Sequence, residues 1–222
     1  MNLQKTYNFL TSLKQNNNRE WFKANENMYQ TAKKEFETLI ELLILGIKEF
    51  DNEIGSPVAK DCIFRIFRDV RFSHNKEPYK PNFGAFIGLN GRKSEYAGYY
   101  VHFEPENSFL GGGVYMPQPD ILRTIRNAIY NDPTHFKNLV NNPKFKKYFN
   151  ELYGEKLKTA PKGFPKDFPD IDLLRPKHYA VSHPISDNFW QSEKMLVNAL
   201  DIFKAQFTFN RFLNYTIKDM KK

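Results

Sequence analysis

The stretch Asp61–Gly88, DCIFRIFRDVRFSHNKEPYKPNFGAFIG, decides how the rest of the chain is arranged. Its first part alternates apolar and charged residues, which predicts a β-strand over residues 61–72 because neighbouring side chains of a strand point to opposite faces. Arg68 falls on the apolar face, so we expect either a bend there or a buried anionic partner. One face would carry Phe64, Ile66, Val70 and Phe72, and the other Ile63, Arg65, Phe67, Asp69 and Arg71.

Basic residues gather on this predicted strand and on the loop that follows it. The loop contains two prolines and an asparagine, which are typical of turns. Guanidinium groups bind phosphate and carboxylate in bidentate geometry, so we interpret the cluster as an anion-binding site. Asp69 would orient an arginine or act as a base, and Tyr79 would donate a hydrogen bond; alternatively, Asp69 simply pairs with the arginines. The candidate ligand-binding residues are Arg65, Arg68, Arg71, Lys76 and Lys80.

Closely spaced strands follow the loop, at residues 83–88, 96–104 and 109–116, and His178–Ser182 is a candidate for one more. Short turns between them favour an antiparallel meander. In the strand over 96–104, Tyr99 and its alternate neighbours would face one way, and Tyr100, His102 and Glu104 the other. A histidine beside a carboxylate is available for acid and base catalysis, although an ordinary exposed strand face explains the same residues.

Amphipathic helical patterns flank the predicted sheet on both sides, which indicates the α+β class. We expect a single domain over residues 1–222, with helices in 1–55, the sheet in 61–116 and mostly helices in 119–222. Residues 154–176 would form a basic ordered loop held by apolar anchors. The last apolar residues, from Trp190 to Ile217, predict one long helix with a kink.

The composition excludes several classes of protein. With 41% hydrophobic and 16% aromatic residues among 222, the chain can bury a core, and no apolar run is long enough to span a membrane. The N-terminal residues lack the apolar region of a signal peptide, and the single Cys62 permits no internal disulfide. We therefore expect a cytoplasmic protein with no membrane partner.

The formal charge of +8 is uneven along the chain. Residues 56–95 hold eight Lys and Arg against four Asp and Glu, and residues 133–180 hold ten against five. A basic surface attracts nucleic acid or phosphorylated metabolites, or serves solubility alone.

Neither a cofactor nor a metal site is predicted. The triple glycine Gly111–Gly113 lacks the Gly-Lys-Ser/Thr of a phosphate loop, and the helix expected after it opens on Asp120, which would repel a phosphate. We interpret these glycines as a bulge or a close-packing site. A metal at His102 and Glu104 would need a third ligand, and nothing in the spacing of the other histidines brings one there.

Three blocks of the sequence resemble a bacterial family, the domain of unknown function 2461. They are RIFRDVRFSHNKEPYKPNFGAF, YYVHFEPENSFLGGGVYMP with the following LRTIRNAI, and PKGFPKDFPDIDLL. The family pattern Arg-Asp-x-Arg-Phe-Ser, then Pro-Tyr-Lys, matches residues 68–73 and 78–80. The chain departs from it at Asp167-Phe168-Pro169, where the pattern has Asp-His-Pro, so a role for that histidine does not transfer. The resemblance implies one domain of a known type and leaves its chemistry open.

Three hypotheses on function follow. The preferred one is a protein that binds or acts on a small phosphate- or carboxylate-bearing ligand through the basic cluster. The second is a nucleic-acid-binding domain that also uses the lysines of residues 144–166, with Tyr153 or Phe164 available for stacking. The third is an interaction module without catalytic activity.

Overall fold

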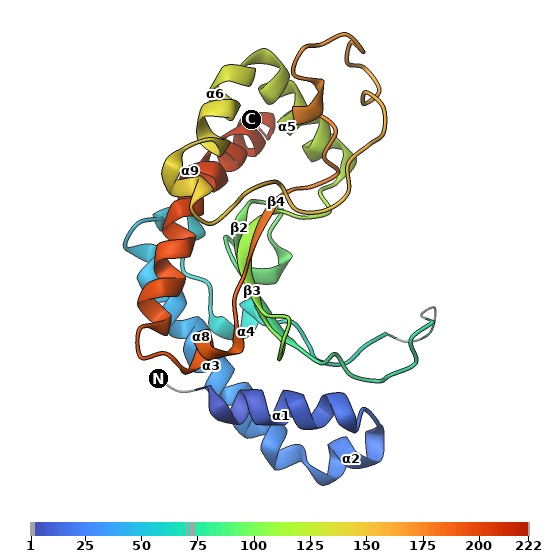
Figure 1. Ribbon diagram of the computed structural model, residues 1–222, viewed down its shortest axis with the longest axis vertical. Helices are drawn as coiled ribbons and strands as arrows, with labels where there is room; N and C mark the ends of the chain where they lie inside the picture. Colours follow the sequence, from blue (N-terminus) through green and yellow to red (C-terminus); the bar gives the residue numbers. More distant parts are fainter. Residues whose placement is uncertain (1–2, 70, 72–73, 222) are drawn as a thin grey trace.

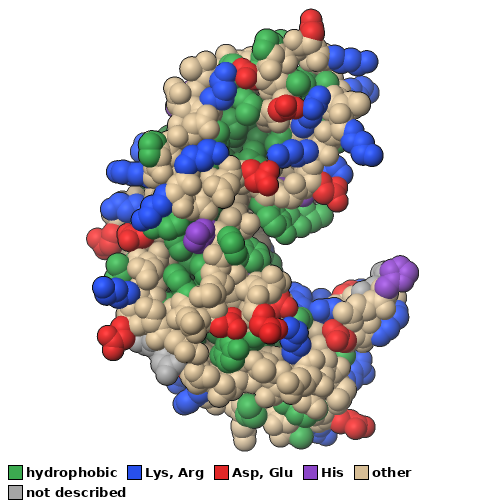
Figure 2. All heavy atoms as spheres, viewed as in Figure 1, with side chains coloured by type: hydrophobic (Ala, Val, Ile, Leu, Met, Phe, Trp, Pro, Cys, Tyr) green, Lys and Arg blue, Asp and Glu red, His purple; other side chains and the backbone are tan. Residues whose placement is uncertain are grey.

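The computed structural model describes residues 3–69, 71 and 74–221 and has the predicted α+β architecture. A four-stranded antiparallel sheet, in the order β1-β2-β3-β4, lies at its centre, and helices occupy both ends of the chain (Figure 1). The molecule is curved, with a deep hollow on one side (Figure 2). The strands are β1 (Phe83–Ile87), β2 (Gly98–Phe103), β3 (Phe109–Val114) and β4 (Tyr179–Pro184); the helices are α1 (Gln4–Gln15), α2 (Arg19–Ala24), α3 (Glu26–Lys48), α4 (Ala59–Cys62), α5 (Pro119–Asn131), α6 (Pro133–Val140), α7 (Pro143–Lys146), α8 (Asp187–Gln191) and α9 (Met195–Met220), with 3-10 turns η1 (Asn52–Ile54), η2 (Gly91–Lys93) and η3 (Ile171–Leu173).

One face of the sheet forms the core, because every strand alternates apolar residues toward the helices. In β2 the side chains of Tyr99, Val101 and Phe103 are completely buried, whereas those between them are half-buried. The ring of Tyr99 packs edge-on against Phe203 of α9, with centroids 5.3 Å apart, and Phe36 of α3 stacks on β1. The two faces predicted for this strand are therefore confirmed.

The triple glycine lets α9 and β4 approach β3 closely, which confirms its interpretation as a close-packing site. A Cβ atom on Gly112 would collide with the carbonyl oxygen of Gly98 and with the Gln206 amide. Gln206 and Asn210 of α9 both donate hydrogen bonds to that carbonyl, at 3.0 and 3.1 Å. The amide nitrogens of both side chains on this buried helix face are thus satisfied by a backbone carbonyl of the sheet.

The predicted strand over residues 61–72 is wrong. The short helix α4 ends at Cys62, and the described residues between it and β1, which are 63–69, 71 and 74–82, form an irregular arm with the isolated bridges Ile63↔Ala85 and Phe67↔Tyr79. Pro78 and Pro81 have no backbone N–H, so a continuous ladder cannot form on that side of the arm. Three residues of these predictions lie outside the described residues: Val70 and Phe72, which were assigned to one face of the strand, and Ser73, which belongs to the family pattern.

The C-terminal prediction needs a correction as well. Trp190 belongs to the separate short helix α8 and packs on Phe103 of β2, with ring centroids 4.6 Å apart. Helix α9 then runs without interruption for 26 residues. None of the helices formed by the described residues is long and apolar enough to cross a membrane.

Candidate ligand-binding site

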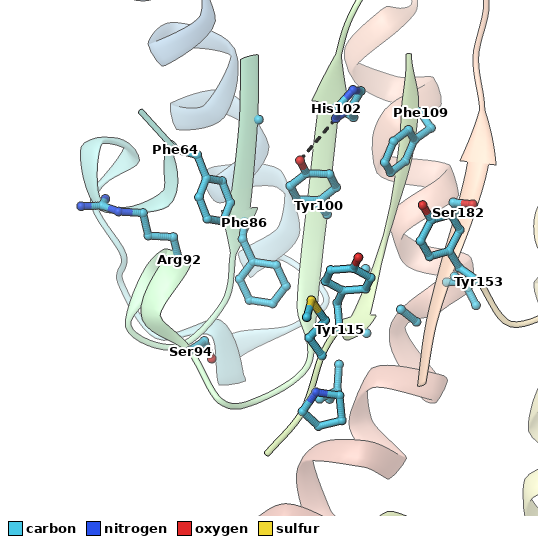
Figure 3. A pocket seen from close by; sticks show the side chains of 18 of the residues that line it. Phe64, Phe86, Arg92, Ser94, Tyr100, His102, Phe109, Tyr115, Tyr153 and Ser182 are labelled. Carbon is cyan, nitrogen blue, oxygen red and sulfur yellow. Dashed lines mark hydrogen bonds between the residues drawn. The ribbon is translucent and has the colours of Figure 1, made fainter. Parts of the chain in front are cut away.

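The second face of the sheet is not covered by helices and forms the floor of the hollow (Figures 2 and 3). The hollow has a volume of about 750 Å³. All four strands contribute to its floor, and its walls come from the arm, from residues 115–118 and from Tyr153. This volume lies within the usual range for sites that hold a small organic molecule.

Aromatic rings form a continuous belt across this floor. Phe64 of the arm lies 6.2 Å from the ring of Tyr100, which lies 5.6 Å from Phe109. Tyr153 and Tyr115 extend the belt to the mouth, where their side chains are 46% and 58% exposed. Figure 3 shows these rings on the same side of the sheet. Exposed rings at this density offer a flat ligand a surface on which to stack.

A chain of hydrogen bonds crosses the floor beside the belt. The Nε2 atom of His102 lies 3.0 Å from an oxygen of Glu104, and that oxygen also accepts from the amide of Asn107 at 3.1 Å. Because a carboxylate only accepts, the imidazole proton belongs on Nε2. The lone pair on Nδ1 then faces the hydroxyl of Tyr100 at 3.3 Å, drawn as a dashed line in Figure 3, and the amide of Asn82 at 3.5 Å.

Burial keeps His102 and Tyr100 of this chain neutral. Desolvation lowers the pKa of His102 below its ordinary 6.5, and the opposing effect of the hydrogen bond that His102 donates to Glu104 only reduces that shift. The ring also stacks on Phe109, with centroids 4.6 Å apart. Desolvation raises the pKa of Tyr100 to about 12, so its hydroxyl stays protonated. The site therefore holds a neutral histidine, available as a base, next to a phenolic hydrogen-bond donor.

Two basic side chains of the predicted cluster, Arg65 and Lys80, line the hollow. Among the described residues neither forms an ion pair with an acid, although the charge of Arg65 contributes to lowering the pKa of Asp69, which is paired with Arg71. The two acids in the hollow are engaged elsewhere: Glu104 with His102, and Glu95 with Lys221 at 2.7 Å. Burial, followed by the positive charges of Arg65 and Arg68, lowers the pKa of Lys80. This end of the hollow thus carries positive charge that the protein itself does not neutralise.

The remaining residues of the predicted cluster do not line the hollow. Asp69 and Arg71 form a bidentate ion pair at the surface of the arm, with distances of 2.9 and 2.7 Å, and this pair lowers the pKa of Asp69. Arg68 lies 3.9 Å from Glu77, and Lys76 is exposed on the arm. The geometry of Asp69 agrees with the alternative that it simply pairs with an arginine.

Tyr79 is a core residue in this structure. Its ring is 6% exposed and stacks on Phe22 of α2, with centroids 4.0 Å apart and an interplanar angle of 9°. Asn17 clamps its backbone, accepting from the Tyr79 N–H and donating to the carbonyl. The side chain therefore anchors the arm to the N-terminal helices and does not reach the hollow.

Several residues of the site escaped the sequence analysis. Strand alternation did place Tyr100, His102 and Glu104 on one face, which the structure shows to be the floor of the hollow. Asn82 carries no local pattern that marks it, and Tyr153 was named only as a residue that could stack on nucleic-acid bases; the fold brings them to the site from a loop beside β1 and from a segment before β4. Among the described residues, no group of three or more His, Cys, Asp or Glu side chains could hold a metal ion.

Comparison with known proteins gives a family and no function. Residues 5–212 match the model of a family described as conserved hypothetical protein (DUF2461). The chain belongs to this family. The match confirms the resemblance seen in the sequence and includes every residue that lines the hollow. No curated protein and no solved structure matches the chain. Of the described residues that match Arg-Asp-x-Arg-Phe-Ser and Pro-Tyr-Lys, Lys80 alone lines the hollow.

Proposed function

We propose that the hollow binds a small organic anion that also carries a planar apolar group. The observation that supports this most directly is the pair Arg65 and Lys80, which lines the hollow and has no carboxylate partner among the described residues. Arg71, by contrast, is paired with Asp69. A cationic site that the protein leaves unneutralised is completed by a phosphate or carboxylate from outside.

The aromatic belt determines the other half of the ligand. Phe64 lies between the cationic and the aromatic parts of the site, since its ring centroid lies 6.0 Å from the Lys80 ammonium and 6.2 Å from that of Tyr100. A ligand whose anionic group contacts Arg65 would therefore place its remaining atoms against Phe86 and Tyr100. Stacking on these rings favours a flat, apolar body.

A nucleic acid is the alternative, and the basic segment 133–180 gives it less support. Four of its ten cations form ion pairs: Lys137 with Asp170 at 3.0 Å, Lys156 with Glu151 at 3.3 Å, Arg175 with Asp172 at 2.6 Å, and Lys177 with Glu155 at 2.6 Å. Cations already paired release few counterions when nucleic acid binds. The exposed rings of Tyr115 and Tyr153 are the feature that would still serve stacking on bases.

Calorimetric titration with phenyl phosphate and benzoate tests the proposal. Arg65→Gln should weaken binding on the order of tenfold or more, because a hydrogen bond to a charged group is worth about 1.5–3 kcal/mol. Lys162→Gln is the matched control: it removes one positive charge from the exposed basic loop, outside the hollow. Equal losses in the two variants, or no binding to the wild type, would contradict the proposal.

A single-stranded oligonucleotide provides the second arm of the experiment. If nucleic acid is the ligand, the logarithm of its affinity falls steeply with the logarithm of salt concentration, in proportion to the number of phosphates contacted. Tight oligonucleotide binding with such a slope, and no binding of phenyl phosphate, would replace the small anion with nucleic acid.

A further inference from the structure

Lys80 has surroundings that are unusual for a lysine used only as a counter-charge. Its side chain is half-buried in the wall of the hollow, and its ammonium group lies over the ring of Phe64. No described acid pairs with it, and the charges that act on it are those of Arg65 and Arg68. An amine next to other cations and partly removed from water loses its proton more readily, and lysines activated in this way act as nucleophiles.

The hydrogen-bond chain of the floor begins close to this amine. Asn82 follows Lys80 by two residues, lines the same hollow and reaches Nδ1 of His102 at 3.5 Å. The hydroxyl of Tyr100 occupies the space above Gly84, where a Cβ atom would stand only 2.7 Å from it. An amine, a neutral imidazole and a phenol therefore line the same hollow, and the ring of Phe64 lies between the Lys80 ammonium and the ring of Tyr100.

We propose that Lys80 is a catalytic nucleophile that condenses with the carbonyl group of a small aromatic oxo-acid, while Arg65 holds the carboxylate of that acid. This inference rests on the proposed function, which supplies the bound anion, and it assigns the substrate class of the same site. In this arrangement the ring of the acid stacks on the aromatic belt, its carboxylate pairs with Arg65, and its carbonyl carbon is attacked by Lys80.

The condensation needs no oxidant and no further reactant. The Lys80 nitrogen attacks the carbonyl carbon, a C–N bond forms, and the π electrons of the C=O bond move to oxygen, which takes up a proton. The C–O bond then breaks as the oxygen takes up a second proton and leaves as water. The nitrogen loses both of its protons in the two steps and forms a C=N double bond to the carbon. Amine and ketone thus yield an imine and one water molecule. The proton carriers proposed for this step are Nδ1 of His102 and the Tyr100 hydroxyl, which line the same hollow and lie 3.3 Å apart.

Reductive trapping tests this inference on the full chain. The protein is incubated with phenylpyruvate and cyanoborohydride, which converts the imine into a stable secondary amine, and labelled lysines are mapped by peptide mass spectrometry. We expect Lys80 to be labelled on the order of tenfold faster than exposed lysines, because binding holds the carbonyl beside one amine. Lys80→Arg keeps the charge and should abolish this selective label, whereas Lys162→Arg should leave it unchanged. His102→Gln should slow labelling without preventing binding.

Phenyllactate separates failure of this inference from failure of the proposed function. It has the same ring and carboxylate as phenylpyruvate but no carbonyl, so it should raise the melting temperature of the wild type and of Lys80→Arg without forming an adduct. If phenyllactate stabilises both proteins and Lys80 is trapped no faster than Lys162, the nucleophile is refuted while anion binding stands. If phenyllactate stabilises neither and no selective label appears, both proposals fall.

Discussion

Removal of one buried hydroxyl, in Tyr99→Phe, should destabilise the protein measurably. The hydroxyl donates to Asp51 at 2.7 Å, with both side chains almost fully buried, and the other carboxylate oxygen accepts from the backbone of Glu53 at 3.0 Å. Burial and the nearby carboxylate raise the pKa of Tyr99, so it stays a donor. A buried hydrogen bond to a charged group is worth about 1.5–3 kcal/mol, and water cannot replace the lost donor at this depth. We therefore expect the free energy of unfolding to fall by about 2 kcal/mol.

Urea denaturation followed by fluorescence measures this loss, and a double-mutant cycle with Asp51→Asn isolates the interaction between the two side chains. Tyr7→Phe is the matched control, because the hydroxyl of Tyr7 also donates to a carboxylate, that of Asp187 at 3.1 Å, but at a half-exposed position. Its loss should cost less than about 1 kcal/mol, since water can take the place of the donor. If Tyr99→Phe costs no more than Tyr7→Phe, or the cycle shows no coupling, the reasoning is refuted.

Three further outcomes are expected. The pKa of His102 is lowered in the folded state, so the unfolded chain binds more protons than the folded one as the pH falls below 6.5, and the free energy of unfolding should decrease on acidification through that range. Urea titrations at several pH values measure this decrease. Because the pKa of His178 is lowered as well, His102→Gln is compared in a His178→Gln background, where it should make the decrease smaller. Gly111→Ala should cost about 3 kcal/mol or prevent folding, because its Cβ would collide with the backbone carbonyl of Val181; unchanged thermal stability would disprove this contact. Burial raises the pKa of the Cys62 thiol to about 11, so a thiol reagent at pH 8 should label it only after unfolding, and rapid labelling of the native protein would show the site to be open.

Much of the fold could be predicted from local patterns. The period of two in residues 96–104 placed Tyr99 on the core face and Tyr100 on the opposite face, because pleating alone separates neighbouring side chains. The amphipathic stripes likewise predicted α3 and α9. The same reasoning failed for residues 61–72, where Arg68 already interrupts the alternation, because a strand also needs a partner with free N–H groups, and Pro78, whose carbonyl accepts from the Arg68 N–H, has none to return.

The site depended on distances that no local pattern contains. Arg65, Arg71 and Lys80 look equivalent as residues of one basic stretch, yet Arg71 is neutralised by its neighbour Asp69, whereas the other two line the hollow and form no ion pair within the described part of the chain. Binding of an anionic ligand depends on the cations that remain without an ion pair. Ion pairs form over a few ångströms, between groups that only the folded chain brings together. Local periodicity thus establishes which side chains face the core and which face away from it. The packing of the arm, the sheet and Tyr153 establishes where cations stay unpaired and where a ligand can reach them.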